Sequence, residues 1–318
     1  MKLIIQIPCL NEAETLPKTL ADLPKQIDGI DEIETLVIDD GSTDNTSEVA
    51  LQHGVNHVVR LTKCKGLAAG FSTGLDACLK RGADIIVNTD ADCQYKGSDI
   101  PRLIKPILDG KADIVIGNRD IENVAQFSWV KKRLQRLGSW VVRQLANSKI
   151  PDTTTGFRAY NKEAALRLNI ISDYTYTLES IIQAEHKNLA VENITIITNK
   201  VDRPSRLFKN IPQYIKRSMI TIVRVYSMFN PFSLFMRLGM ICMLFAFFIG
   251  CRFVYYYFLT GGTGKIQSLI LAAILTIVGF QLIIIGIVAD LISANRRLIE
   301  DTLLRVKKIE LNLKTPKK

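Results

Sequence analysis

Apolar and polar residues alternate in blocks over the first 200 residues, and the blocks predict strands separated by helices. Short apolar runs bounded by polar residues are typical of buried strands, and longer periodic segments are typical of helices. We predict strands at residues 3–7, 34–38, 55–61, 85–88, 112–116 and 191–197, the first of them stopped by Pro8. We predict helices beginning near Thr15 and at residues 45–52, 66–81, 100–108, 128–147 and 178–186. This alternation indicates an α/β fold with a mostly parallel, doubly wound sheet.

Polar residues gather directly after four of the predicted strands. They are Asn11 and Glu12, Asp39 and Asp40, Asp90 and Asp92, and Arg119. Ligands of open α/β sheets bind beyond the carboxyl ends of the strands. These four groups therefore predict a single site at one edge of the sheet.

The apolar run 85–87 leads into Asp90 and Asp92, one residue apart, and then Gln94. Two acids with one spacer, just past a strand end, can hold a hard divalent cation and leave room for diphosphate oxygens on it. The alternative is an ordinary strand-terminating turn, because Asp and Asn favour turns.

The composition changes after residue 208. Residues 211–229 mix basic and apolar side chains, which favours an amphipathic helix in a membrane interface over a surface helix packed on the soluble domain. Two apolar runs follow, at 232–259 and 266–289, and the second has no charged residue. At ~1.5 Å per residue the second run reaches ~36 Å, enough to cross a hydrocarbon core of ~30 Å. Both runs are predicted to span a membrane.

Basic residues flank the outer ends of this predicted hairpin, and the loop at 260–265 is nearly uncharged. By the positive-inside rule, both termini are expected in the cytosol. Residues 291–318 are predicted to continue as a charged helix.

The charge and the cysteine content of the chain limit the kinds of partner and metal site that we expect. The net charge is +10, which indicates an anionic partner, but much of this charge flanks the predicted membrane helices, so we expect no nucleic acid. The six cysteines form no CxxC pair and the three histidines show no metal-ligand spacing. A disulfide framework and a zinc site are therefore not expected.

Six motifs occur in order along residues 1–208, and together they resemble family 2 glycosyltransferases. The resemblance is to the branch that holds dolichol-phosphate mannose synthases and bacterial polyprenyl-phosphate glycosyltransferases. The two-helix anchor is similar to that of bacterial undecaprenyl-phosphate glucosyltransferases. Thr154-Thr155 and Cys93 depart mildly from the family pattern. The motifs cover residues 7–12, 37–44, 65–70, 89–94, 117–119 and 152–158.

The resemblance implies a GT-A fold, Rossmann-like with a mostly parallel sheet, and Mg²⁺ or Mn²⁺ as cofactor. It divides the chain into a catalytic domain (1–208), an amphipathic juxtamembrane helix (209–231), a transmembrane hairpin (232–290) and a cytosolic tail (291–318). The oligomeric state is left open, and a homo-oligomer is one possibility.

The resemblance also implies roles for individual residues. Catalytic roles fall to Asp90, Asp92 and Asp152, the last as either a base or an orienting group. The metal ligands would be Asp92 and Gln94 with Asp90. The residues implied for the nucleotide-sugar are Pro8, Asn11, Glu12, Asp39, Asp40, Lys65 and Asp90. Those implied for the acceptor phosphate are Arg119, Lys132, Arg133, Ser205 and Arg206.

The expected function is inverting transfer of one sugar from a nucleotide-diphosphate sugar, UDP-glucose by likeness of the anchor, to undecaprenyl phosphate. The reaction would take place at the cytosolic face of a bacterial inner membrane. The alternatives are GDP-mannose or another donor, and a hydroxyl acceptor on a lipid-linked saccharide. A non-enzymatic membrane scaffold is disfavoured by the intact Asp40, Asp90, Asp92 and Arg119.

Overall fold

A computed structural model describes residues 1–119, 152–172, 175–199, 219–220, 223–224, 226–260 and 266–314. The chain divides into two compact units. The first comprises Met1–Ile222 with Leu304–Lys318, and the second comprises Val223–Leu303.

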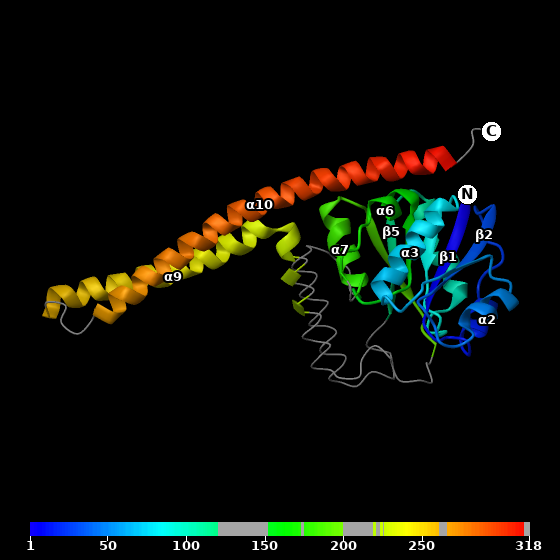
Figure 1. The fold of residues 1–318 in the computed structure, drawn as a ribbon, viewed down its shortest axis with the longest axis horizontal. Coiled ribbons are helices and arrows are strands. Elements are labelled where there is room, and N and C mark those ends of the chain that lie inside the picture. Colours follow the sequence, from blue (N-terminus) through cyan, green and yellow to red (C-terminus); the bar gives the residue numbers. More distant parts are fainter. Residues whose placement is uncertain are drawn as a thin grey trace. The chain divides into compact units, whose positions relative to one another are not determined.

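The first unit is built on a seven-stranded sheet (Figure 1). The strand order is β3-β2-β1-β4-β6-β5-β7, in which β6 is antiparallel to both neighbours and every other pair is parallel. The mostly parallel sheet is thus confirmed, but β6 was not predicted. The strands are β1 (Lys2–Cys9), β2 (Glu32–Asp39), β3 (His57–Arg60), β4 (Ile85–Asn88), β5 (Ile114–Arg119), β6 (Arg158–Asn161) and β7 (Val191–Ile196).

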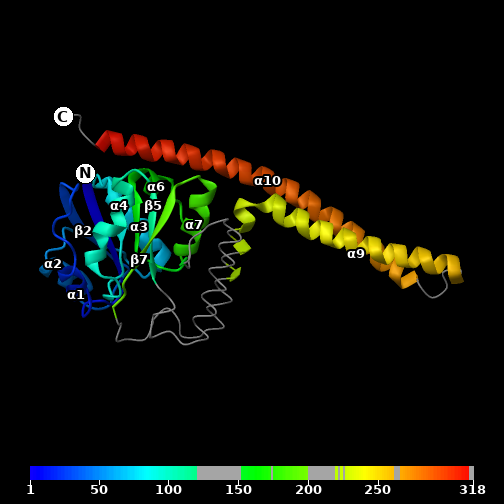
Figure 2. The ribbon, with the colours of Figure 1, turned by 180° about the vertical axis from the view of Figure 1, so that it is seen from behind.

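Helices cover both faces of this sheet (Figures 1 and 2). α3 packs on β1 and β2 from one face, and α4 packs on β4, β5, β6 and β7 from the other. The predicted helices in the described part of the domain are present within one or two residues, and α6 is additional. The helices are α1 (Leu16–Ala21), α2 (Thr46–Gln52), α3 (Leu67–Lys80), α4 (Ile100–Leu108), α6 (Lys162–Arg167) and α7 (Thr177–His186).

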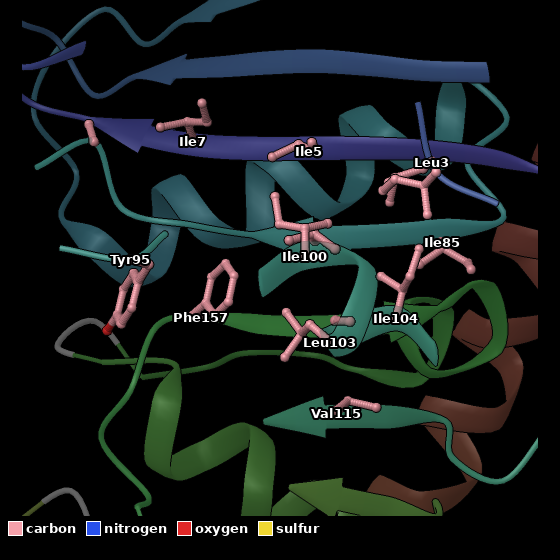
Figure 3. Packing of buried hydrophobic residues seen from close by; sticks show 14 of the residues in the cluster. Leu3, Ile5, Ile7, Ile85, Tyr95, Ile100, Leu103, Ile104, Val115 and Phe157 are labelled. Carbon is pink, nitrogen blue, oxygen red and sulfur yellow. The ribbon is translucent and has the colours of Figure 1, made fainter. Parts of the chain in front are cut away.

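The core follows the two-residue period of the strands. Leu3, Ile5 and Ile7 of β1 lie in one apolar cluster with Ile100 and Leu103 from the start of α4 (Figure 3). The alternate residues of β1 face α3, where a β-carbon at Gly74 would lie 2.4 Å from Oε1 of Gln6. Glycine is required there because α3 approaches the sheet so closely.

The predicted end of the first strand at Pro8 is wrong. β1 continues to Cys9, although proline cannot donate to a ladder. β4 pairs with β1 only as far as Gln6, whose carbonyl accepts from the Thr89 N–H. Because Pro8 is two residues after Gln6, its backbone nitrogen faces the same side of β1, toward β4. At Pro8, however, β1 has already passed the last residue that pairs with β4. The missing N–H of Pro8 therefore breaks no ladder bond.

The second unit contains the apolar helices α9 (Pro231–Thr260) and α10 (Ile266–Lys314), the latter ending in the first unit. Both are long and apolar enough to cross a membrane, with mean hydropathies of 2.2 and 2.7 in their most apolar stretches. They pack closely where a β-carbon on Gly239 would lie 2.8 Å from the Gly279 carbonyl oxygen. The predicted helix at 128–147 lies outside the described residues, as does most of the amphipathic segment 211–229.

Candidate active site

Strand register brings the predicted motifs to one edge of the sheet. Cys9 of β1 is level with Asp39 of β2, and Gln6 is level with Asn88 of β4. Because β6 runs the other way, its first residue, Arg158, lies beside Asn88. The segments that leave β1, β2 and β4 and the segment that enters β6 therefore meet at the same end of the sheet.

The two aspartates after β2 are held inside the domain. Asp39 is fully buried and its Oδ1 accepts from the Ser42 N–H at 2.7 Å. Asp40 accepts from the N–H groups of Lys65 (2.7 Å) and Gly66 (2.8 Å), just before α3. Only the backbone of Lys65 takes part, because its side chain is exposed. Both carboxylates thus brace the turn and the start of α3.

Glycine follows these aspartates for a steric reason. Gly41 has φ +72°, and a β-carbon there would lie 2.6 Å from the backbone carbon of Lys63. Only glycine avoids this clash while adopting a positive φ. The Asp-Asp-Gly sequence therefore allows the turn after β2 to pack against the segment before α3.

The loop after β1 is tied to the same turn. Asn11 also has a positive φ, +56°, and its Oδ1 accepts from the Thr43 N–H at 2.8 Å. Its own N–H donates to the Ser42 hydroxyl at 2.9 Å. Glu12 accepts from the Thr15 hydroxyl at 2.6 Å, at the start of α1. Both predicted nucleotide-binding residues therefore also have a structural role.

The two aspartates after β4 are in a different electrostatic situation. Burial and repulsion from Asp92 together raise the pKa of Asp90 to about 7, although the nearby Arg119 lowers it. Two carboxylates that disfavour each other's charge attract a cation. This is the environment predicted for the metal-binding aspartates.

A neutral hydrogen-bond network holds the backbone of Gly156 against Asp90. A β-carbon on Gly156 would lie 2.9 Å from Oδ1 of Asp90 and 3.0 Å from the Tyr176 hydroxyl. The buried Asn88 amide donates to the Gly156 carbonyl at 2.8 Å and to the Tyr176 hydroxyl at 2.9 Å. Any larger residue than glycine would displace the Asp90 carboxylate.

Arg119 and Asp152 form a buried, bidentate ion pair. The guanidinium donates to both carboxylate oxygens, at 2.7 Å and 3.2 Å, and Asp152 is fully buried. Burial alone would raise the pKa of Asp152, but Arg119 and the hydrogen bonds from Thr154 lower it below its usual range. A carboxylate with a lowered pKa and two occupied oxygens is a poor base. The geometry favours the orienting role for Asp152.

Arg158 is a functional candidate that the sequence reasoning did not single out. Its side chain is fully buried and donates to the carbonyls of Thr153 (3.0 Å), Thr155 (2.9 Å) and Thr177 (2.9 Å). The cation thus holds the loop at 152–157 in shape. Gln6 and Asn88 are a separate case: these polar residues interrupt the apolar runs of β1 and β4, and the sequence signals a buried hydrogen bond there because buried polar residues need partners.

The predicted metal ligands are suited to a hard cation, but they supply only part of its coordination. No group of three His, Cys, Asp or Glu side chains that could hold a metal ion occurs among the described residues. The Gln94 N–H donates to the Asp92 carboxylate at 3.1 Å, so the two residues share one turn. Carboxylate and amide oxygens suit Mg²⁺ or Mn²⁺ when diphosphate and water supply the remaining ligands.

Four of the predicted acceptor residues lie outside the described part of the chain and stay predictions. They are Lys132, Arg133, Ser205 and Arg206. Pro8 lies at the site edge within β1, where its β-carbon is 3.9 Å from the β-carbon position built on Gly70 of α3.

Curated relatives resemble the chain over its first part. An undecaprenyl-phosphate mannosyltransferase of Micrococcus luteus is 32% identical over 184 residues, 55% of this chain and 74% of the relative. A polyprenol monophosphomannose synthase of Mycolicibacterium smegmatis is 28% identical, covering 61% of this chain and 76% of the relative. A dolichol-phosphate mannosyltransferase of Pyrococcus furiosus is 31% identical, covering 59% and 54%.

Solved structures share the fold. Glucosyl-3-phosphoglycerate synthase from Mycobacterium tuberculosis, in complex with Mn²⁺, UDP and glucosyl-3-phosphoglycerate, has a TM-score of 0.55 and 19% identity. The match covers 70% of this chain and 79% of that one. The family model described as glycosyl transferase family 2 matches residues 4–168. Because that match covers more than half of the 318 residues, the protein is an enzyme that belongs to glycosyl transferase family 2.

Proposed function

We propose that the protein transfers one sugar from a nucleotide-diphosphate sugar to the phosphate of a polyprenyl lipid at a membrane surface. The names of three relatives, all transferases that act on polyprenyl or dolichol phosphates, support this acceptor class. The acidic residues at the edge of the sheet would hold the donor diphosphate through a cation. The buried Arg119 beside them would bind a second anion, the acceptor phosphate.

The observation that carries the proposal is the exposed apolar surface of α9 and α10. Their most apolar stretches are only 11% and 17% buried, and Phe258 is 82% exposed. Core helices of a soluble protein would bury such side chains, and large exposed apolar surfaces mark membrane or partner contacts. A transferase with this anchor is suited to an acceptor that itself lies in the membrane. By the positive-inside rule, we place both termini on the cytosolic side.

On the donor side, Asp90, Asp92 and Gln94 would bind Mg²⁺ or Mn²⁺ together with the donor diphosphate. A bound divalent cation neutralises the negative charge that develops on the departing diphosphate. The structures of glucosyl-3-phosphoglycerate synthase with Mn²⁺ or Mg²⁺ and UDP support a cation of this class. The pKa of Asp90, near 7 through burial and repulsion from Asp92, is consistent with a carboxylate that is stabilised when a cation arrives.

On the acceptor side, an oxygen of the lipid phosphate forms a bond to the anomeric carbon. The bond from that carbon to the diphosphate oxygen breaks, and the nucleoside diphosphate leaves with the electron pair from the opposite face. The configuration at the anomeric carbon therefore inverts. A phosphate monoester with a second pKa of ~6 is already largely ionised at pH 7, so a strong base is not required.

The Arg119–Asp152 pair fits this acceptor better than it fits a hydroxyl acceptor. A hydroxyl would need a base to remove its proton, and Asp152 is occupied by Arg119. With an anionic acceptor, the pair instead fixes the guanidinium, which can then orient phosphate oxygens. The hydroxyl alternative is therefore disfavoured.

We propose two nucleotide sugars as the donors to be tested. Likeness of the two-helix anchor to undecaprenyl-phosphate glucosyltransferases favours UDP-glucose, and the names of the three relatives favour a mannose donor such as GDP-mannose. The acidic residues described above would hold the diphosphate through the bound cation, and because both donors contain this diphosphate, these residues do not discriminate between them.

The test uses the purified full-length chain in detergent, undecaprenyl phosphate, Mn²⁺ or Mg²⁺, and either UDP-glucose or GDP-mannose with a labelled sugar. We expect one donor to give a labelled lipid phosphate sugar that mild acid hydrolyses, with no product in EDTA. Transfer to a hydroxyl-bearing saccharide lipid without transfer to undecaprenyl phosphate would refute the proposed acceptor.

A further inference from the structure

The residue between the two predicted metal ligands has an unusual backbone. Cys93 lies between Asp92 and Gln94 and has φ +57°. Residues with a β-carbon rarely adopt this left-handed conformation unless surrounding contacts impose it. Because the backbone of Cys93 sets the directions of its neighbours, this conformation decides whether Asp92 and Gln94 can reach the same cation.

One side of this loop is held by α1 and the residue before it. The Thr19 hydroxyl donates to the Ala91 carbonyl at 3.0 Å and lies 3.1 Å from the sulfur of Cys93. The sulfur is also 3.6 Å from the Thr15 carbonyl oxygen. These contacts fix the side chain of Cys93 but do not touch its carbonyl group.

The other side is held by the segment that follows β7. The side-chain amide of Asn199 donates to the Cys93 carbonyl at 3.0 Å, and its backbone N–H donates to the Gln94 carbonyl at 2.9 Å. The adjacent Thr198 forms an antiparallel bridge with Tyr95. One asparagine thus binds the carbonyls of two successive peptides, Cys93–Gln94 and Gln94–Tyr95.

We propose that Asn199 is a positioning residue for the metal-binding loop, holding Cys93 left-handed so that Asp92 and Gln94 bind one divalent cation. The inference rests on the proposed function for the identity of the metal ligands. Partners of metal ligands commonly tune affinity by fixing ligand orientation. Since Asn199 touches only backbone atoms of the loop, it acts through geometry and not as a ligand.

Two substitutions separate the side-chain contact from the backbone contact. Asn199→Asp keeps the shape and the backbone N–H, but its carboxylate cannot donate to the Cys93 carbonyl. Asn199→Ala removes the side-chain contact without adding charge. Asn193→Ala, an exposed asparagine of the neighbouring β7, is the matched control.

The measurement is Mn²⁺ binding followed by electron paramagnetic resonance, with the full chain in detergent and saturating UDP or GDP, whichever wild type binds. We expect about a tenfold weaker Mn²⁺ affinity in both Asn199 variants, at the low end for residues that orient metal ligands because this contact is exposed. Nucleotide binding in EDTA and the thermal midpoint should stay at wild-type values, and Asn193→Ala should change nothing.

Wild-type Mn²⁺ affinity in both variants would overturn the inference, as would a loss that is equal in Asn193→Ala or that parallels a lowered thermal midpoint. Absence of Mn²⁺ binding by wild type would overturn it too. A wild-type protein that binds Mn²⁺ and nucleotide but transfers no sugar to lipid phosphate would instead defeat the proposed function alone.

Discussion

Two acidic turns lie at the same edge of the sheet and look alike in sequence, but their carboxylates differ. After β2, Asp39 and Asp40 are buried and accept hydrogen bonds from backbone N–H groups of their own domain. After β4, none of residues 1–119, 152–172 and 175–199 donates a hydrogen bond to the carboxylate of Asp90. Its pKa is raised to about 7 by burial and by Asp92.

The difference indicates that Asp39 and Asp40 stabilise the fold and that Asp90 is suited to a ligand. Asp92 lies between these two cases, because its carboxylate also accepts from the Gln94 N–H at 3.1 Å. A carboxylate that accepts backbone hydrogen bonds is stabilised as an anion before any ligand arrives. Two carboxylates that repel each other make the unliganded protein less stable, and a bound cation relieves that cost. The predictions below test this distinction between the turn after β2 and the turn after β4.

The largest effect is expected for Asp92→Ala. Asp92 would help to hold the cation that neutralises charge in the transition state, and loss of such stabilisation costs roughly 100- to 1,000-fold in kcat. We expect that loss together with weaker Mn²⁺ binding. The free energy of unfolding without metal should change little, because the repulsion removed from Asp90 offsets the lost hydrogen bond from the Gln94 N–H. Steady-state kinetics and thermal unfolding in EDTA measure the two quantities. Full activity in this variant would contradict the assignment of Asp92 to the metal.

Asp152→Asn should mainly destabilise the fold. The change leaves the buried Arg119 guanidinium without its counter-ion, which costs about 3 kcal/mol in comparable buried pairs. Urea unfolding at pH 7 measures this loss. The Thr154→Ser change, which removes a methyl group but keeps the hydroxyl beside Asp152, is the control.

The effect of Asp152→Asn should also depend on pH. Because the folded-state pKa of Asp152 is lowered, its stabilisation is fully present above the unfolded value of ~3.9 and is lost as pH falls through the lower folded value. The difference in unfolding free energy between wild type and variant should therefore be constant near pH 7 and shrink below about pH 4. A difference that grows in acid would rule out the lowered pKa.

Hydrophobic pattern predicted most of the fold because the elements are short and regular. Each of the six predicted strands is present, and so are the predicted helices that fall within the described residues. The acidic character of this edge of the sheet was also predictable from the sequence, because each pair of aspartates follows a strand. The aspartates are Asp39, Asp40, Asp90 and Asp92. What the pattern leaves open is which acids receive partners from elsewhere in the chain, as Asp40 does from Lys65 and Gly66, 25 and 26 residues further on.

The misses have the same origin. β6 begins with the charged Arg158, which looks unlike a buried strand until the carbonyls of Thr153, Thr155 and Thr177 surround its guanidinium. The positive φ of Cys93 depends on Asn199, more than a hundred residues further along the chain. Local sequence carries no trace of either contact, so only tertiary structure can reveal them.

A smaller effect is expected for Asn88→Ala. The change leaves the buried Gln6 amide without its Asn88 partner and leaves the Gly156 carbonyl with only the Tyr176 hydroxyl at 3.4 Å, which costs about 2 kcal/mol. The loop beside Asp90 also loses its attachment to β4, so kcat should fall by about tenfold. Unfolding and kinetics measured on the same preparation test whether the neutral network holds the acidic edge. A loss of stability with unchanged kcat would show that the network stabilises the fold without positioning the site.

The smallest effect is expected for Asp40→Asn. The amide oxygen can still accept from one of the two N–H groups that Asp40 now binds, at Lys65 and Gly66, but its NH₂ group faces the other. Loss of about one hydrogen bond to a charged acceptor predicts a decrease in unfolding free energy of about 1.5 kcal/mol, with kcat and Mn²⁺ affinity unchanged. Chemical denaturation in EDTA and Mn²⁺ titration test both parts. If nucleotide affinity instead falls more than tenfold while stability is unchanged, Asp40 acts on the donor and the two turns share one function.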